Sequence, residues 1–141
     1  MKIDDSFNIT AKISAKLSRY SESIRTGMRR IADKVSDKLE KELRRNSPKR
    51  DKSSRNRGTR AKNWAPGSYA RSWGQITTVD NFSEYEKTVR NKSHYQLTHL
   101  LENGHRKRNN GFVKPRVHIE PEEKKAEWEY YHEIEQLIKN N

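Results

Sequence analysis

The chain contains no cysteine, which excludes disulfides, thiolate metal sites and cysteine nucleophiles. It also lacks an apolar run long enough for a signal peptide or a membrane span, so we expect a protein made in the cytoplasm with no membrane partner. Apolar residues are scarce, at 30% of the 141 residues, whereas charged residues make up 35%. A core this small often needs further copies of the chain to complete it. We therefore expect one domain, residues 1–141, that forms oligomers.

Negative charge is also in short supply, because 31 Lys and Arg stand against 19 Asp and Glu, for a formal net charge of +12. Such a balance favours polyanionic partners, either nucleic acid or an acidic protein surface. Basic residues are concentrated in one segment that has Asp51 as its single acid, namely Arg44, Arg45, Lys49, Arg50, Lys52, Arg55, Arg57, Arg60 and Lys62. Acids are concentrated near the end of the chain, at Glu120, Glu122, Glu123, Glu127, Glu129, Glu133 and Glu135.

Apolar residues recur at intervals of three or four from Ile9 to Leu43. This spacing predicts one long amphipathic helix that ends at Ser47-Pro48. Gly27 is expected to bend or interrupt the helix, since glycine costs about 1 kcal/mol relative to alanine at such a position. Residues 44–67 are rich in Ser, Gly, Pro and charge, and we interpret them as a mobile basic arm with Trp64 as an anchor near its far end.

Two segments rich in β-branched and aromatic residues, Ser72–Val79 and Glu84–Asn91, flank a turn-forming "DNFS" and predict an antiparallel hairpin. His94–Asn103 carries leucines at helical spacing, and Gly104 stands where a left-handed C-cap is expected. This second pattern predicts a short helix after the hairpin.

Val113, Val117 and Ile119 alternate with polar residues, which predicts a half-buried strand beside the hairpin, and Pro115 places that strand at an edge. Pro121, followed by two glutamates, predicts the start of the last helix. Its buried stripe is expected to contain Ala126, Tyr130, Tyr131, Ile134, Leu137 and Ile138. The fold class expected is α+β, with a long N-terminal helix and a C-terminal helix packed on a small, mostly antiparallel sheet, plus the basic arm.

Metal and catalytic sites find little support in the spacing. The five histidines, His94, His99, His105, His118 and His132, include no i, i+4 pair of the kind that binds zinc on a helix. We expect His99 and His118 to be partly buried and bonded to backbone or carboxylates, and His105 to lie on a loop surface. A ribonuclease would use Glu102, His105, Arg106 and Arg108 as base, acid and phosphate holders, but only their proximity in sequence suggests it. We expect no enzyme activity, no metal and no cofactor.

DNA binding is a stronger alternative, because the basic arm could neutralise several phosphates. No helix-turn-helix or zinc finger pattern is present, and aromatic residues are not interleaved with the basic ones as stacking platforms would be. Any DNA contact is therefore expected to be non-specific.

The run "LTHLLENGH", a basic turn with Gly111, then "KPRVHIEP" and a Glu-rich terminal helix, resembles the siphophage neck proteins of the HK ninety-seven gene-product-ten type. The resemblance covers Tyr95 to about Glu123 most closely, and "APGSYARSW" matches the family's entry to the sheet more loosely. The residues that carry the motif are Leu100, Glu102, Gly104, His105, Pro115, His118 and Pro121.

This resemblance implies a non-enzymatic virion protein for tail completion or head-tail joining, located in the neck or tail and assembled in the host cytoplasm. It also implies a ring, with six as the expected copy number, between a head-tail connector and a tail terminator or tail tube protein. The candidate contacts with neighbouring subunits or with DNA in the channel are the nine basic residues above together with Arg106, Lys107 and Arg108. A basic nucleic-acid-binding protein of a phage or mobile element, without a virion role, is the alternative.

Overall fold

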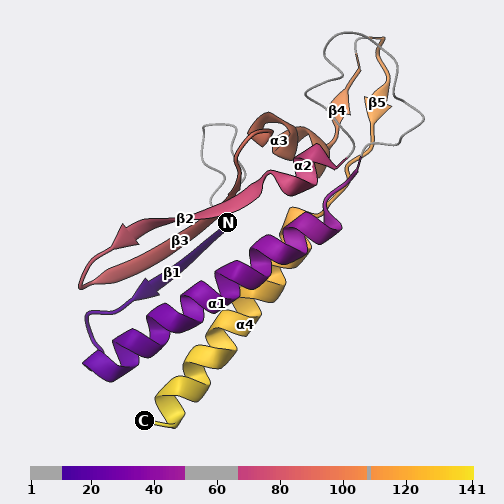
Figure 1. Cartoon of the computed structure of the whole chain (residues 1–141). Helices are drawn as coiled ribbons and strands as arrows, with labels where there is room; N and C mark the ends of the chain where they lie inside the picture. Colours follow the sequence, from indigo (N-terminus) through magenta and orange to yellow (C-terminus); the bar gives the residue numbers. More distant parts are fainter. Residues whose placement is uncertain (1–10, 50–66, 108) are drawn as a thin grey trace.

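The computed structural model describes residues 11–49, 67–107 and 109–141. The elements in chain order are β1 (Ala11–Lys16), α1 (Glu22–Asn46), α2 (Ser68–Arg71), β2 (Trp73–Asp80), β3 (Glu84–Asn91), α3 (Tyr95–Asn103), β4 (His105–Arg106), β5 (Phe112–Val113) and α4 (Ile119–Lys139). The long helices α1 and α4 pack on a three-stranded antiparallel sheet (Figure 1), which confirms the expected α+β class. Trp64 and most of the predicted basic arm lie outside the described residues, whereas Arg44 to Asn46 belong to α1.

The prediction of one continuous helix from Ile9 to Leu43 is wrong in its first part. Residues 11–16 form the strand β1, in which Ala11, Ile13 and Ala15 are buried and the residues between them are exposed. An interval of four is even, so residues at i and i+4 share a face of a strand as well as a face of a helix. The spacing of Ile9, Ile13 and Leu17 therefore could not distinguish a helix from a strand. Hydrogen bonding of β1 to β3 determines that residues 11–16 form a strand.

The second part of the prediction is confirmed by α1. Ser21 caps this helix, since its hydroxyl accepts a hydrogen bond from the backbone N–H of Ile24 at 3.5 Å. The helix ends at Asn46, and its C-cap Ser47 stands directly before Pro48. Its buried face lies across all three strands and consists of Met28, Ala32, Val35, Ser36, Leu39 and Leu43.

The sheet has the order β1-β3-β2, so β3 is central, and the predicted β2–β3 hairpin is confirmed. One face packs against α1, where Tyr85 and Val89 are buried. The opposite face carries paired charges, with Lys16 Nζ 3.0 Å from the Glu84 carboxylate and Lys12 Nζ 3.7 Å from that of Glu86. The sheet is therefore one-sided, with a polar outer face, as antiparallel sheets commonly are.

The predicted edge strand containing Val113, Val117 and Ile119 is wrong. Only Phe112 and Val113 are in a strand, β5, and it pairs with β4 in a separate two-stranded hairpin rather than with the main sheet. Val117 is exposed, and Ile119 is buried as the first residue of α4. The third place in the main sheet is taken by β1, a strand from the other end of the chain.

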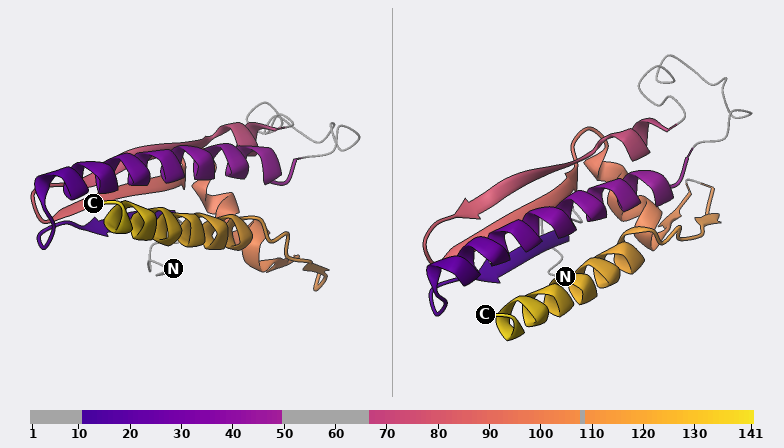
Figure 2. Two further views of the ribbon diagram at one scale, coloured as in Figure 1. Left: turned by 90° about the horizontal axis from the view of Figure 1, so that it is seen from below. Right: turned by 60° about the horizontal axis from the view of Figure 1, so that its bottom comes forward.

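The last helix, α4, begins two residues before Pro121 and lies beside α1 in both Figure 1 and Figure 2. Ala126 and Tyr130 are buried, and Ile134 and Leu137 pack against the core as predicted. Tyr131 and Ile138 are exposed, so their assignment to the buried stripe is wrong. Among the described residues, no helix has both the length and the apolar character needed to cross a bilayer.

Gly27 does not interrupt α1, contrary to the expectation from its helix propensity. A Cβ placed on it would lie 2.7 and 2.8 Å from the two δ-carbons of Leu137 on α4. Those distances are shorter than van der Waals contact, so any larger residue at position 27 would displace Leu137 or separate the helices. Glycine therefore costs some helix stability here but permits close packing of α1 on α4.

Candidate functional site

Glu102, at the end of α3, caps the N-terminus of α4. Its carboxylate is only 8% exposed and accepts hydrogen bonds from the backbone N–H of His118 at 2.9 and 3.3 Å. The N–H of Ile119 lies 3.0 Å from each carboxylate oxygen. The first N–H groups of a helix have no partner within the helix, and a negative charge is favoured there. One side chain of the motif thus connects two helices that are separated in sequence by the β4–β5 hairpin.

Gly104 turns the chain from α3 into β4 with φ 73° and ψ 173°. The predicted positive φ is confirmed, although ψ is extended rather than left-handed helical, a combination adopted almost only by glycine. A Cβ at this position would lie 2.5 Å from the carbonyl oxygen of Val113 and 3.0 Å from the Phe112 ring. The close approach of β5 therefore requires glycine at position 104.

His118 is buried beside Glu102 and is held at both ring nitrogens. Nδ1 lies 2.7 Å from the carbonyl oxygen of Arg116, which can only accept, so Nδ1 carries the hydrogen. Nε2 lies 2.8 Å from the Tyr69 hydroxyl, and the two rings meet edge to face. Burial, together with the nearby Glu102 carboxylate, raises the pKa of the Tyr69 hydroxyl above its ordinary value. Tyr69 therefore remains a neutral donor at ordinary pH, and the prediction of a buried, bonded His118 is confirmed.

The contacts continue from Tyr69 to the end of α1. The Tyr69 ring meets Trp73 edge to face at 5.9 Å, and the Trp73 indole N–H donates to the Ser47 hydroxyl at 2.7 Å. The Asn91 amide donates to the Tyr69 carbonyl at 2.8 Å. We refer to these residues as the junction cluster, defined as Ser47, Tyr69, Trp73, Asn91, Glu102 and His118. The cluster connects the ends of α1, α2, β2, β3, α3 and α4.

Sequence reasoning placed Glu102 and His118 in one motif but did not identify the rest of the junction cluster. Tyr69 entered only as a loose match, and Asn91 only as the end of a strand. These residues are far apart in sequence and show no common periodicity, so no local pattern could have grouped them.

The other motif residues lie apart from the cluster. Leu100, Pro115 and Pro121 are exposed, and Pro121 occupies the first turn of α4, where a missing N–H is tolerated. His105 is half-buried in β4, so the expectation that it lies on a loop surface is wrong, and its Nδ1 has no hydrogen-bond partner among the described residues. The motif residues that the structure brings together thus act on chain geometry, because they set the turn after α3 and the start of α4.

The acid–base arrangement considered for a ribonuclease gains no support from this geometry. Glu102, its proposed base, already accepts the backbone N–H groups at the start of α4. The described histidines have separate surroundings: for example, His94 bonds to the Ser68 hydroxyl at 2.6 Å, and His132 stacks on Trp128. Within residues 11–49, 67–107 and 109–141, no three His, Asp or Glu side chains are grouped as metal ligands would be.

The basic candidate residues fall into three groups. Arg44 is structural, because its guanidinium donates to the Trp73 carbonyl at 2.7 and 3.0 Å and pairs with Glu40 at 3.2 Å. Arg45, Lys49, Arg106 and Lys107 are exposed. The remaining candidates lie outside the described residues, namely Arg50, Lys52, Arg55, Arg57, Arg60, Lys62 and Arg108.

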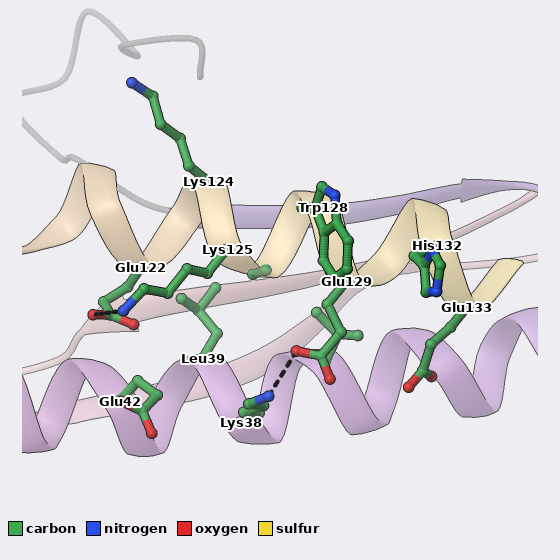
Figure 3. Close-up of a pocket in the computed structure, with 12 residues that line it drawn as sticks. Lys38, Leu39, Glu42, Glu122, Lys124, Lys125, Trp128, Glu129, His132 and Glu133 are labelled. Atoms are coloured by element: carbon green, nitrogen blue, oxygen red, sulfur yellow. Dashed lines mark hydrogen bonds and ion pairs between the residues drawn. The ribbon is translucent and has the colours of Figure 1, made fainter.

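Most of the glutamates of α4 are paired within the chain. Lys34 Nζ lies 2.5 Å from the Glu133 carboxylate and Lys38 Nζ 2.9 Å from that of Glu129, and these carboxylates raise the pKa of both lysines. Figure 3 shows the Lys38–Glu129 pair bridging a groove of about 810 Å³ between α1 and α4. Further pairs on α4 itself are Glu120–Lys124, Glu122–Lys125 and Glu135–Lys139. The acidic end of the chain therefore presents less unpaired charge than its composition indicates.

Both edges of the main sheet are obstructed. On β1, the Ser14 carbonyl accepts a hydrogen bond from the Tyr130 hydroxyl of α4 at 3.4 Å. On β2, Arg44 occupies the Trp73 carbonyl, and the register shifts between Thr77 and Val79. Bulges and edge charges hinder the addition of a further strand. Side chains, rather than strand pairing, are thus the main contacts that this sheet can offer a neighbour.

Comparison with known proteins places this geometry in a family. The family model described as "Bacteriophage HK97-gp10, putative tail-component" matches residues 11–104, from β1 to Gly104. No curated protein and no solved structure is significantly similar to the chain. The match includes Leu100, Glu102 and Gly104, while His105, Pro115, His118 and Pro121 lie beyond it. It covers more than half of the 141 residues. The chain therefore belongs to the HK97-gp10-like family of phage tail components.

Proposed function

We propose that this protein is a non-enzymatic neck subunit of a tailed phage or prophage, which completes the tail or joins it to the head. The observation that carries the proposal is the family match over residues 11–104, the part of the chain that includes the sheet and α1. Its partners are further copies of itself, a head-tail connector, and a tail terminator or tail tube protein. Its place is the neck or tail of the virion, after assembly in the host cytoplasm.

The proposed assembly is a ring, with six as its copy number, through which DNA passes. Three features support a subunit that is completed by neighbours: the small apolar share, the one-sided sheet, and a hairpin that projects from the body (Figure 2). A closed ring needs a heterologous contact, in which two different surfaces of the same chain meet.

The basic segment that begins after α1 is proposed to contact the neighbouring subunit's α4 or to line the DNA channel. We expect reversal of three of its charges, Arg55→Glu, Arg57→Glu and Arg60→Glu, to impair assembly or DNA delivery, because both depend on charge attraction. Plaque titre and electron microscopy of lysates measure the two effects. Normal titre with normal particles would refute both roles.

The experiment that tests the proposed function is electron microscopy of lysates from a phage in which this reading frame is deleted. We expect filled heads lying beside separate, otherwise complete tails, because a missing joining subunit leaves both halves able to form. Restoration of joined particles by the intact gene supplied in trans is the control. Intact, infectious particles from the deletion phage would refute the neck role.

A second candidate, a nucleic-acid-binding protein without a virion role, is favoured by one observation. Arg106, Lys107, Lys114 and Arg116 are exposed, and their side chains form no ion pair with any described residue. Such cations would give affinity for DNA that falls steeply as salt rises. Finding the chain in purified virions at a fixed stoichiometry would exclude this candidate. Absence of the chain from virions would support the candidate.

A further inference from the structure

The β4–β5 hairpin carries positive charge that the rest of the described chain does not neutralise. No Asp or Glu occurs between Gly104 and Ile119. Four basic side chains described in this stretch are exposed and form no ion pair with another described residue, namely Arg106, Lys107, Lys114 and Arg116. We refer to these four residues with Phe112 and Val117 as the basic hairpin.

The basic hairpin also exposes apolar side chains. Phe112 is 60% exposed and Val117 is 53% exposed. The hairpin projects away from the sheet and from α1 (Figures 1 and 2), and each of its strands has only two residues. An isolated two-stranded hairpin is at best marginally stable in water. The hairpin therefore presents basic and apolar side chains together on one projecting element.

A second exposed surface lies on α4, on the side turned away from the core. Trp128 is 67% exposed and Tyr131 63% exposed, and Trp128 stacks on His132 with ring centroids 4.9 Å apart. Figure 3 shows these two stacked rings on successive turns of α4. A shallow pocket of about 390 Å³ surrounds them, lined by Lys124, Glu127, Trp128, Tyr131, His132 and Glu135. We refer to these six residues as the α4 outer face.

We propose that the basic hairpin of one subunit docks on the α4 outer face of a second copy. The charges are complementary at Glu127, which has no ion-pair partner among the described residues. The other two charged residues of the outer face are already paired within α4, Glu135 with Lys139 at 2.9 Å and Lys124 with Glu120 at 2.8 Å. The apolar side chains are complementary as well, since Phe112 and Val117 can cover Trp128 and Tyr131. Exposed aromatic residues of this kind are frequent hot spots in protein interfaces.

A second copy fits the hairpin better than DNA does. Phosphate groups could pair with the four cations, but they offer nothing to Phe112 and Val117. Contact within one chain is disfavoured, because α4 leads away from the hairpin and Trp128 lies roughly 13 Å along the helix from Ile119. The contact joins two different surfaces, so repetition extends it from subunit to subunit. The contact itself does not depend on the proposed function. Only the closure of the row of subunits into a ring rests on the proposed function.

Two matched variants of the full chain test the contact. The hairpin variant carries Phe112→Ser and Arg106→Glu, and the α4 variant carries Trp128→Ala and Tyr131→Ser. All four side chains are exposed, so both variants should fold. We expect sedimentation velocity to show self-association of the native chain weakened about 30-fold or more in each variant, as for loss of one hot spot. Phe82→Ser with Arg90→Glu, exposed residues at the β2–β3 turn and on β3, is the control and should associate normally.

Mixing the two variants distinguishes a head-to-tail contact from a symmetric one. Each variant retains one intact surface, so an equimolar mixture should form a 1:1 heterodimer that does not extend. Unchanged association of either variant would overturn the proposal. A hairpin variant that loses affinity for duplex DNA but associates normally would also overturn it, and would assign the hairpin to DNA.

Cross-linking covers the case in which the native chain is monomeric in dilute solution. The chain has no cysteine, so Val117→Cys with Lys124→Cys, which leaves Glu127 in place, introduces the only two thiols. A bifunctional thiol reagent should give a ladder of dimers and larger products, in concentrated protein and in phage lysates, whereas each single-cysteine variant should stop at dimers. No ladder in either preparation would refute the contact. Infectious particles from the deletion phage would refute the neck role. A ladder of cross-linked products would still support the contact between subunits in that case.

Discussion

Replacing Glu102 by alanine is expected to lower the free energy of unfolding by about 2–4 kcal/mol. The carboxylate holds the N–H groups of His118 and Ile119, and the substitution leaves both groups buried with no acceptor. Glu102→Gln should lose less, because one side-chain oxygen remains, although the charge that favours the helix N-terminus is gone. Urea denaturation followed by circular dichroism measures the change.

Glu120→Gln is the matched control for this prediction. Glu120 lies in the first turn of the same helix but is exposed, and within the described part of the chain its ion-pair partner is Lys124. Its loss should cost much less than the loss of Glu102, because a solvent-exposed charge near a helix end contributes little to stability. Equal losses from Glu102→Gln and Glu120→Gln would mean that charge alone, rather than the bonds to His118 and Ile119, stabilises the start of α4.

Replacing Trp73 by alanine is expected to lower the free energy of unfolding by about 3–5 kcal/mol, the range for a large aromatic residue in a core. Trp73 is 1% exposed, contacts the Tyr69 ring, and donates its indole N–H to Ser47. Its removal leaves a cavity at the junction cluster and leaves the Ser47 hydroxyl without its donor. Thermal or urea unfolding of the purified chain measures the loss.

Trp128→Ala supplies the same chemical change at an exposed position. It should alter the unfolding free energy by about 0.5 kcal/mol or less, because a surface side chain leaves no cavity. The two tryptophans are therefore expected to separate stability from assembly, since Trp73 supports the fold and Trp128 is proposed to contact a neighbour. A loss from Trp128→Ala as large as that from Trp73→Ala would contradict this separation.

The junction cluster explains how the fold positions the basic hairpin. The hairpin begins after α3 at Gly104 and ends before α4 at His118. The Glu102 carboxylate accepts a hydrogen bond from the backbone N–H of His118, which holds the end of the hairpin. Both ends are thus fixed to the body although the hairpin itself has little packing. A rigid base with a projecting tip is a suitable arrangement for presenting Phe112 and its neighbouring cations to another subunit.

Local sequence patterns predicted the elements whose neighbours are close in the chain. The β2–β3 hairpin follows from two strand-forming segments around a short turn, and α3 follows from its leucine spacing and Gly104. The start of α4 was predicted within two residues from Pro121 and the glutamates after it. In each case the physical cause is local, namely backbone conformation, strand propensity or the helix dipole.

The failures occurred where a distant partner decides the structure. The spacing of Ile13 and Leu17 fits a helix or a strand equally well, and the pairing of residues 11–16 with β3 selects the strand. Val113 and Val117 alternate as a strand would, but β1 already occupies the place in the sheet that they were assigned. Helix propensity predicts that Gly27 weakens α1, and only the close approach of Leu137 from α4 explains why glycine fits at this position.

The sequence by itself determined the absence of thiol chemistry, the excess of positive charge, the family motif and the α+β class, because composition and local spacing are properties of the chain alone. Tertiary structure alone decided which charges remain unpaired, since Lys34 and Lys38 of α1 meet Glu133 and Glu129 of α4 across the groove. It also decided that the Glu102 carboxylate caps the N-terminus of α4. Pairing and burial depend on residues that are distant in sequence, and only the packed chain brings them within bonding distance.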